Sequence, residues 1–216
     1  MRNIDEINNL NRRSEDIQKY FAEMDLTSEQ LEKRVECAYL AFTVYDLLLI
    51  MFLTMKEYND IDEDYLKTTL TNRILSVITG MSTPDDYLID YAIKSSDAFI
   101  DNTIKNQDDD FYSSEDRALI SGELFANAVL NYTEYKTAQA EGKTHKVWHS
   151  VKLPTTREPH ANLSGHKIRI DELFNVGGIK MRFPMDAEPS GGGNKYLKQA
   201  MNCKCTVKYL PEDKEV

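Results

Sequence analysis

Apolar residues recur at helical spacing through the first two thirds of the chain. Three sets share this spacing: Leu66, Leu70, Ile74 and Ile78; Leu88 and Ala92; and Leu119, Gly122, Phe125, Ala126, Val129 and Leu130. Residues three and four apart lie on one face of a helix. Each set therefore predicts an amphipathic helix whose apolar face needs a partner to cover it.

Start and stop signals mark the ends of these helices. The stretch "TSEQ" at Thr27 has the form of a capping box, in which a side-chain oxygen accepts a hydrogen bond from an amide of the first turn. "STPDD" offers Ser82 or Thr83 as the cap of another helix, and "SSED" at Ser113 offers a third cap. Gly142 is suited to end the last helix, because glycine readily adopts the left-handed conformation found there.

The run from Cys37 to Met55 is apolar around almost its whole circumference. Such a segment is either the buried central helix of a bundle or a membrane span. Asp46 lies in its middle, where a carboxylate would be costly in hydrocarbon. The amphipathic helices also need a common core. The sequence therefore favours a central helix with a buried or half-buried Asp46, and a membrane span is the alternative.

After Gly142 the apolar period changes from that of a helix to that of a strand. Alternating residues occur in "HKVWHSV" (145–151), "HKIRI" (166–170) and "CKCTVKYL" (203–210). We therefore expect an α+β fold with two domains: a mainly helical N-terminal domain, residues 1–142, and a small domain of short β-strands, residues 143–216.

The charge of the chain divides at the same point. Residues 1–142 hold 13 Lys and Arg against 28 Asp and Glu, a balance of −15, whereas residues 143–216 hold 13 against 8, a balance of +5. The net charge of −10 excludes a protein built as a whole to coat nucleic acid. Contacts of the basic C-terminal domain with DNA would be weak and independent of base sequence.

Two of the three cysteines, Cys203 and Cys205, are one residue apart. This odd, small number, with no signal-peptide pattern in residues 1–10, favours a reducing compartment. On a strand, both thiols would point to the same face. We expect them to pack in the core of the small domain. A zinc site completed by His160 is one alternative, although no fourth ligand is evident, and a disulfide is another.

No recognised catalytic motif is present. "VGGIKM" and "SGGGN" are glycine-rich but lack the ending of a phosphate-binding loop, so we expect flexible turns there. The chain contains neither a Gly-x-Ser-x-Gly elbow nor a His-Glu-x-x-His pair. Arg157 and His160 are expected to lock a loop, with Arg157 donating to backbone carbonyls or to a carboxylate such as Asp171.

The C-terminal part carries a set of residues in a characteristic order. It reads "KVWHSVKLPTTREPHANLSGHKIRIDELF", then "FPMD" and "NCKC". The set is Trp148, Arg157, His160, Gly165, Asp171, Phe174, Pro184, Asn202, Cys203, Lys204 and Cys205. From residue 115 to residue 210, this pattern resembles the phage Mu F-like family of head morphogenesis proteins, the minor capsid proteins of tailed bacteriophages.

The resemblance implies a structural protein of the virion that acts in head morphogenesis and uses no cofactor. Such proteins associate with the portal inside the capsid after assembly in the host cytoplasm, and they aid genome packaging or delivery. Portal or other head proteins would be the partners, facing the acidic helices. The family often carries acidic residues where this chain has Pro154 and Ser164. Any chemistry or metal binding by those carboxylates would be absent here.

Two other classes of function stay open. Proteins of this family are sometimes fused to toxin or nuclease domains, and His160 and Arg157 would then serve as the acid–base and anion-binding groups. The apolar run Cys37–Met55, taken alone, would support a membrane-associated protein that acts in DNA entry.

Overall fold

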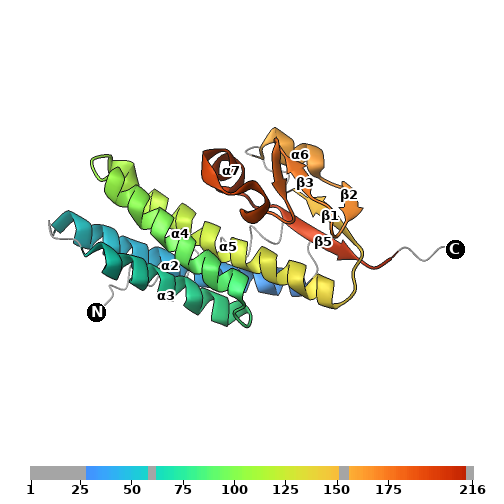
Figure 1. The fold of residues 1–216 in the computed structure, drawn as a ribbon, viewed down its shortest axis with the longest axis horizontal. Coiled ribbons are helices and arrows are strands. Elements are labelled where there is room, and N and C mark those ends of the chain that lie inside the picture. Colours follow the sequence, from blue (N-terminus) through green and yellow to red (C-terminus); the bar gives the residue numbers. More distant parts are fainter. Residues whose placement is uncertain (1–27, 58–61, 151–155, 213–216) are drawn as a thin grey trace.

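The computed structural model describes residues 28–57, 62–150 and 156–212, so the cap predicted at Thr27 lies outside the described residues. Long helices come first, and short strands with smaller helices follow (Figure 1). In chain order the elements are α2 (Ser28–Glu57), α3 (Glu63–Met81), α4 (Asp86–Lys105), the 3-10 helix η1 (Asp110–Ser113), α5 (Glu115–Ala140), β1 (His145–His149), α6 (Glu158–Leu163), β2 (Lys167–Arg169), β3 (Phe174–Val176), β4 (Ile179–Met181), η2 (Glu188–Ser190), α7 (Gly193–Ala200) and β5 (Thr206–Leu210). The α+β prediction is confirmed. Whether residues 1–142 and 143–216 are separate folding domains stays a prediction.

The helix ends follow the sequence signals with one exception. The prediction of a hydroxyl cap for α4 is wrong, because Asp85 is the cap and its Oδ1 accepts a hydrogen bond from Leu88 N at 3.0 Å. A carboxylate there also interacts favourably with the positive end of the helix dipole. Ser114 caps α5 from within the predicted motif. Gly142, with φ +69°, follows the last turn of α5 as expected.

The apolar helix α2 is covered along one face only. Its buried apolar residues are Cys37, Ala41, Val44, Tyr45, Leu48, Met51 and Phe52. Tyr39, Ile50 and Leu53, on the opposite face, are 49%, 61% and 62% exposed. The helix predicted as central, Cys37–Met55, is therefore buried on one face only, and Asp46 is half-buried as expected.

The central helix is α5, which packs against α2 and also contacts β5 (Figure 1). Gly122 allows α2 and α5 to approach closely, because a Cβ at this position would lie 2.6 Å from Ala41 O. At the other end of the contact, the buried guanidinium of Arg34 donates to Asn131 and Glu134 at 3.0 Å each. Backbone contact and charged hydrogen bonds thus fix how these two helices are aligned.

Within the described part of the chain, one helix, Leu31–Glu57, is long and apolar enough to cross a membrane. A core helix of a soluble protein meets the same criterion. One face of α2 packs on other helices, as a core helix does, while its length and composition also suit a membrane span. The membrane span therefore stays a prediction.

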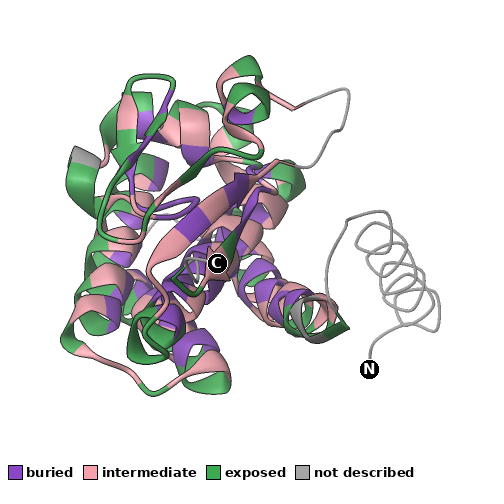
Figure 2. Cartoon of the chain, turned by 90° about the vertical axis from the view of Figure 1, so that its right-hand side faces the viewer, coloured by how far each residue is buried: buried purple, intermediate pink, exposed green. Residues whose placement is uncertain are grey.

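The three predicted strands form one antiparallel sheet in the order β2-β1-β5. Trp148 pairs with Val207, and both are buried on the inner face of the sheet. Val147 pairs with Lys167 on one side and Lys208 on the other, so these residues share the outer face. Buried residues gather along the inner side of this sheet and between the helices (Figure 2).

Several short elements were not predicted from the sequence. "VGGIKM" is a turn as expected, with Gly177 and Gly178 at φ +58° and +86°, but it joins the strands β3 and β4. "SGGGN" leads into α7, and α6 carries His160. The strands β3 and β4 have three residues each, and the helices α6 and α7 have six and eight. Their runs in the sequence are too short to show an apolar period.

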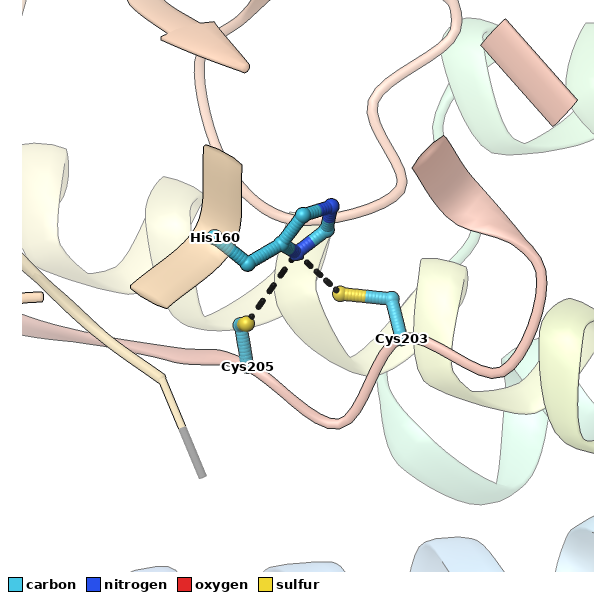
Figure 3. A group of neighbouring side chains, drawn as sticks. All are labelled: His160, Cys203 and Cys205. Atoms are coloured by element: carbon cyan, nitrogen blue, oxygen red, sulfur yellow. Dashed lines mark hydrogen bonds between the residues drawn. The ribbon is translucent and has the colours of Figure 1, made fainter. Parts of the chain in front are cut away.

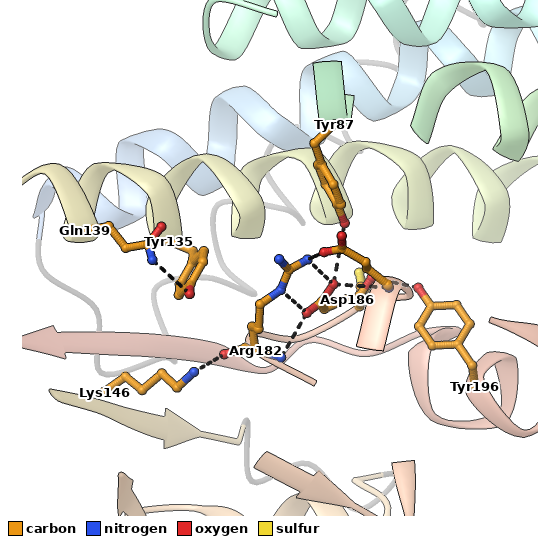
Figure 4. A network of polar contacts seen from close by, with 9 residues as sticks. Tyr87, Tyr135, Gln139, Lys146, Arg182, Asp186 and Tyr196 are labelled. Carbon is orange, nitrogen blue, oxygen red and sulfur yellow. Dashed lines mark hydrogen bonds and ion pairs between the residues drawn. The ribbon is translucent and has the colours of Figure 1, made fainter. Parts of the chain in front are cut away.

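A buried ion pair joins the strand-rich part to the helices (Figure 4). Asp186, which is 0% exposed, accepts hydrogen bonds from Arg182 N, Nε and Nη2 at 2.9, 2.7 and 2.9 Å. Tyr87 of α4 donates to Asp186 at 3.5 Å, and the Arg182 guanidinium lies 5.8 Å from the ring centre of Tyr135 of α5. The pair therefore contacts two helices from the segment that follows β4.

Lys146, next to this pair, is also fully buried. It lies on the same face of β1 as Trp148, and its Nζ donates to Arg182 O at 2.8 Å. The rings of Tyr135 and Phe174 lie 5.5 and 5.2 Å from the ammonium group. Burial, which disfavours the charged form, lowers the pKa of Lys146 to about 8.

Asp186→Ala is expected to destabilise the fold strongly, because it leaves the Arg182 guanidinium without its main partner. Breaking one side of a buried pair costs about 3–5 kcal/mol. The control is Asp171→Ala, since Asp171 pairs with Arg169 on the surface. We expect denaturant unfolding to give an unchanged midpoint for that variant. Equal effects of the two substitutions would contradict the anchoring role of Asp186.

Lys146 is expected to make the free energy of unfolding change with pH in the alkaline range. Lysine in an unfolded chain has a pKa of about 10.4, so between that pH and about 8 the unfolded state binds more protons and stability rises with pH. Compared with Lys146→Met, the wild type should gain about 2–3 kcal/mol in free energy of unfolding between about pH 7 and pH 10.5. Denaturant titrations of both proteins measure this difference. A difference that does not change with pH would show that Lys146 titrates normally.

Candidate functional site

Several of the residues that carry the family resemblance gather around Trp148 in the strand-rich part. Trp148 is 0% exposed, and its ring centre lies 5.1 Å from that of Phe174 and 5.8 Å from that of His160. Gly165 N donates to Trp148 O at 2.8 Å, and its φ of +85° suits glycine. Residues far apart in the sequence, on β1, α6 and β3, thus form one packed centre.

Arg157 locks a turn, as predicted. Its guanidinium donates to Gln199 O at 3.3 Å and to Met201 O. Of the two acceptors expected from the sequence, backbone carbonyls are therefore the correct one. Asp171 lies on the surface, where its Oδ1 accepts from Arg169 Nε at 3.1 Å. The Arg157–Asp171 alternative is wrong, because Asp171 pairs with Arg169 and Arg157 binds the two carbonyls.

His160, Cys203 and Cys205 meet at the edge of the packed centre (Figure 3). The Nδ1 atom of His160 lies 3.3 Å from Cys205 Sγ and 3.5 Å from Cys203 Sγ. The three side chains are 2–5% exposed, and their ligand atoms all lie within 4.8 Å of one another. The sequence suggested this grouping only as the less favoured alternative to core packing. Burial of both cysteines agrees with either interpretation.

A turn, rather than a strand, brings the two thiols together. Cys203 and Cys205 precede β5, so they do not lie on a strand as predicted, but both thiols reach the same side, as expected, and Lys204 pairs with Glu123. Asn202 has φ +54°, a left-handed conformation, and Cys203 N donates to Ala200 O at 3.1 Å. The chain therefore reverses after α7, and both sulfur atoms reach His160 on α6. Asparagine is one of the few residues that adopts this conformation at low cost.

Gln199, which sequence reasoning missed, contacts the other ring nitrogen of His160. Its Oε1 lies 3.1 Å from His160 Nε2. A carbonyl oxygen accepts hydrogen bonds, so Nε2 carries the hydrogen and Nδ1 presents its lone pair to the sulfur atoms. Gln199 lies on α7, a helix without a long apolar period, and no sequence signal marked it.

The environment of Cys203 favours its thiolate form. A hydrogen bond from Cys205 holds the pKa of the Cys203 thiol well below its usual value against the opposing effect of burial, and His160 adds to the lowering. By contrast, burial raises the pKa of Cys37, on α2, to about 12. The two cysteine environments differ because Cys203 has a second thiol and an imidazole beside its sulfur, whereas burial dominates at Cys37.

These groups can bind a metal ion more readily than they can attack a substrate. Two thiols and an imidazole nitrogen are ligands that zinc prefers. A nucleophilic cysteine or an acid–base histidine must reach a substrate, whereas His160 is 2% exposed and Arg157 is bound to two carbonyls. The nuclease alternative with His160 and Arg157 gains no support from this arrangement.

The remaining residues of the pattern connect the centre to α5. Pro184 is buried, and its carbonyl oxygen accepts from Asn131 Nδ2 at 3.0 Å. Lys204, between the two cysteines, points the opposite way and forms an ion pair with Glu123. The pattern therefore describes both the interior of the strand-rich part and its contact with the helix before it.

Comparison of this chain with known protein families, with curated protein sequences and with solved structures gave no match.

Replacing Asn202 tests how the turn holds the cysteines. Asn202→Ala should cost about 1–2 kcal/mol of stability, because alanine is strained at positive φ, whereas Asn202→Gly should be close to neutral. Denaturant unfolding measures the cost. Reaction of the thiols with a disulfide reagent should be faster in the alanine variant, since the turn that buries them opens more often. A glycine variant as unstable as the alanine variant would show that the Asn202 side chain, not its conformation, holds the turn.

Proposed function

We propose that this protein is a minor head protein of a tailed bacteriophage that acts in head morphogenesis, associates with the portal inside the capsid, and aids genome packaging or delivery. The observation that carries the proposal is the packing of the residues on which the resemblance rests. Trp148, His160, Phe174, Cys203 and Cys205 are far apart in the sequence and are all buried in one centre. The resemblance rests on the order of these residues along the chain, and their packing joins them into one structural unit.

The burial of this centre favours a structural role for the motif over a catalytic one. Its side chains contact one another, backbone carbonyls or α5, and they hold the sheet and the short helices in place. A protein that works by assembly needs a rigid unit of this kind with partner surfaces elsewhere. We assign no catalytic residue.

The exposed apolar face of α2 is the proposed attachment surface for the portal. Ile50 and Leu53 are more than half exposed on a helix that packs through its other face. Contiguous exposed apolar residues on soluble proteins mark interaction sites more often than scattered ones do. A head protein must attach to the inside of a capsid, and this face supplies apolar area for it.

The outer face of the sheet is the proposed site of contact with DNA. Lys167 and Lys208 flank Val147 there, and Arg169 pairs with His145 in the same sheet. Three other basic residues of this part are engaged internally: Lys146 is buried, Arg182 binds Asp186 and Lys204 binds Glu123. The surface charge available to phosphates is therefore smaller than the composition indicates, and binding would be weak and salt-dependent.

Co-purification with a portal protein of the same phage tests the proposal. We expect tagged full-length protein to retain the portal, and the double variant Ile50→Asp with Leu53→Asp to lose it, because two carboxylates would be buried in an apolar contact. Both positions are exposed, so the fold should be retained, which circular dichroism checks. The matched control is Leu173→Asp, an exposed leucine of the strand-rich part.

Two results would contradict this assignment. If the portal is not retained by wild-type protein and the protein is absent from purified capsids by mass spectrometry, the proposed function is wrong. If Leu173→Asp abolishes binding and the α2 variant does not, the attachment lies on the strand-rich part.

A further inference from the structure

We propose that His160, Cys203 and Cys205 form a zinc site, in which His160 Nδ1 and the two Sγ atoms supply three of the four ligands. The inference does not depend on the proposed function in phage assembly. It rests on the geometry of the three ligand atoms, on the hydrogen bond to Gln199, and on the charge of the group.

The distances fit a tetrahedral zinc ion. With Zn–N of about 2.0–2.1 Å and Zn–S of about 2.3 Å, a tetrahedral angle places nitrogen and sulfur about 3.6 Å apart. His160 Nδ1 lies 3.3 and 3.5 Å from the two sulfur atoms, so a few tenths of an ångström of adjustment would admit the ion. The side chains come from α6 and from the turn before β5, and both sulfur atoms point at the same nitrogen (Figure 3).

Hydrogen bonds alone do not require both sulfur atoms to lie beside Nδ1. Nδ1 has one lone pair, so one thiol–Nδ1 and one thiol–thiol hydrogen bond would satisfy the group, yet both Cys203 Sγ and Cys205 Sγ lie within hydrogen-bond distance of Nδ1. A metal ion accounts for this convergence directly, because it replaces the two thiol hydrogens and binds all three atoms at once.

Gln199 supplies the outer contact that a zinc-bound histidine requires. A metal-bound imidazole usually donates its other N–H to an acceptor, which fixes the tautomer and the direction of the ring. Gln199 Oε1, 3.1 Å from His160 Nε2, is such an acceptor. Gly177 lies against this amide, because a Cβ on Gly177 would be only 2.8 Å from Gln199 Nε2. The β3–β4 turn therefore leaves the space in which Gln199 orients His160.

The charge of the site suits a buried position. Two thiolates and one Zn²⁺ sum to zero, whereas two buried thiolates without a cation would carry an uncompensated charge. Sulfur and imidazole ligands exclude Mg²⁺ and Ca²⁺, which require oxygen. No fourth His, Cys, Asp or Glu joins the group among residues 28–57, 62–150 and 156–212, so the described part of the chain supplies three ligands and leaves one tetrahedral position for a further ligand.

The ion would fasten α6 to the turn before β5. These segments are more than forty residues apart in sequence, and Arg157 already links them through Gln199 O and Met201 O. Zinc would add a second link on the other side of the same turn. Its loss should therefore lower the thermal stability of the whole chain rather than affect a loop alone.

The test uses the full chain, purified without chelators. We expect one zinc per chain by elemental analysis, and near-background zinc in Cys203→Ser and in Cys205→Ser. The matched control is Cys37→Ser: Cys37 is also buried, but it lies on α2 with Asn127 3.7 Å from its sulfur, so zinc should be retained. Metal-free protein titrated with Co²⁺ should develop the thiolate-to-cobalt absorption band and reach its maximum at one equivalent.

Gln199→Leu tests the positioning role while leaving the three ligands in place. Removing an outer-shell acceptor of this kind weakens metal affinity about 10–100-fold, and Gln199→Glu should restore it. Competition with a zinc indicator measures both affinities, and circular dichroism checks that each variant is folded. Wild-type protein with neither bound zinc nor a cobalt band would overturn the site, as would equal zinc loss in Cys37→Ser. Unchanged affinity in Gln199→Leu would overturn the role of Gln199.

Discussion

The need to cover α5 on two sides governs how the rest of the chain is arranged. One side of this helix meets α2, where Gly122 brings the two backbones together and Arg34 binds Asn131 and Glu134. Another side meets the strand-rich part, where Tyr135 packs on Phe183 and Tyr209. Asn131 takes part in both contacts, because it also donates to Pro184 O. The helical and strand-rich parts therefore share one apolar core, and neither covers α5 alone.

Polar groups, rather than apolar area alone, fix the orientation of the strand-rich part on α5. Asp186, Arg182 and Lys146 are held in a layer bounded by the rings of Tyr87 and Tyr135 (Figure 4). Apolar contacts tolerate sliding, whereas a buried ion pair is stable only when its hydrogen bonds are made. Lys146 and Trp148 enter from the same face of β1, so this layer also positions the tryptophan around which the candidate site is packed.

The candidate site and the proposed partner surfaces lie in different places. His160, Cys203 and Cys205 are inside the strand-rich part, whereas Ile50 and Leu53 of α2 and Lys167 and Lys208 of the sheet face outward. In this arrangement a metal would stabilise the unit that presents the surfaces and would take no part in chemistry. This division is consistent with a protein that acts by assembly.

The sequence alone determined the elements with strong periodicity: the amphipathic helices, the three strands of the β2-β1-β5 sheet and the helix end near Gly142. It also indicated His160, Cys203 and Cys205 as possible partners, because their residue types suit zinc. Only the tertiary structure decided that α5 is central, that Lys146 rather than Val147 faces inward, and that Gln199 orients His160. The alternating pattern distinguishes the two faces of a strand but does not say which face is buried. In β1 the buried face is the one that carries the large side chain of Trp148. The meeting of His160 with two cysteines depends on the left-handed turn at Asn202 and on packing between segments distant in sequence, and neither leaves a periodic signal.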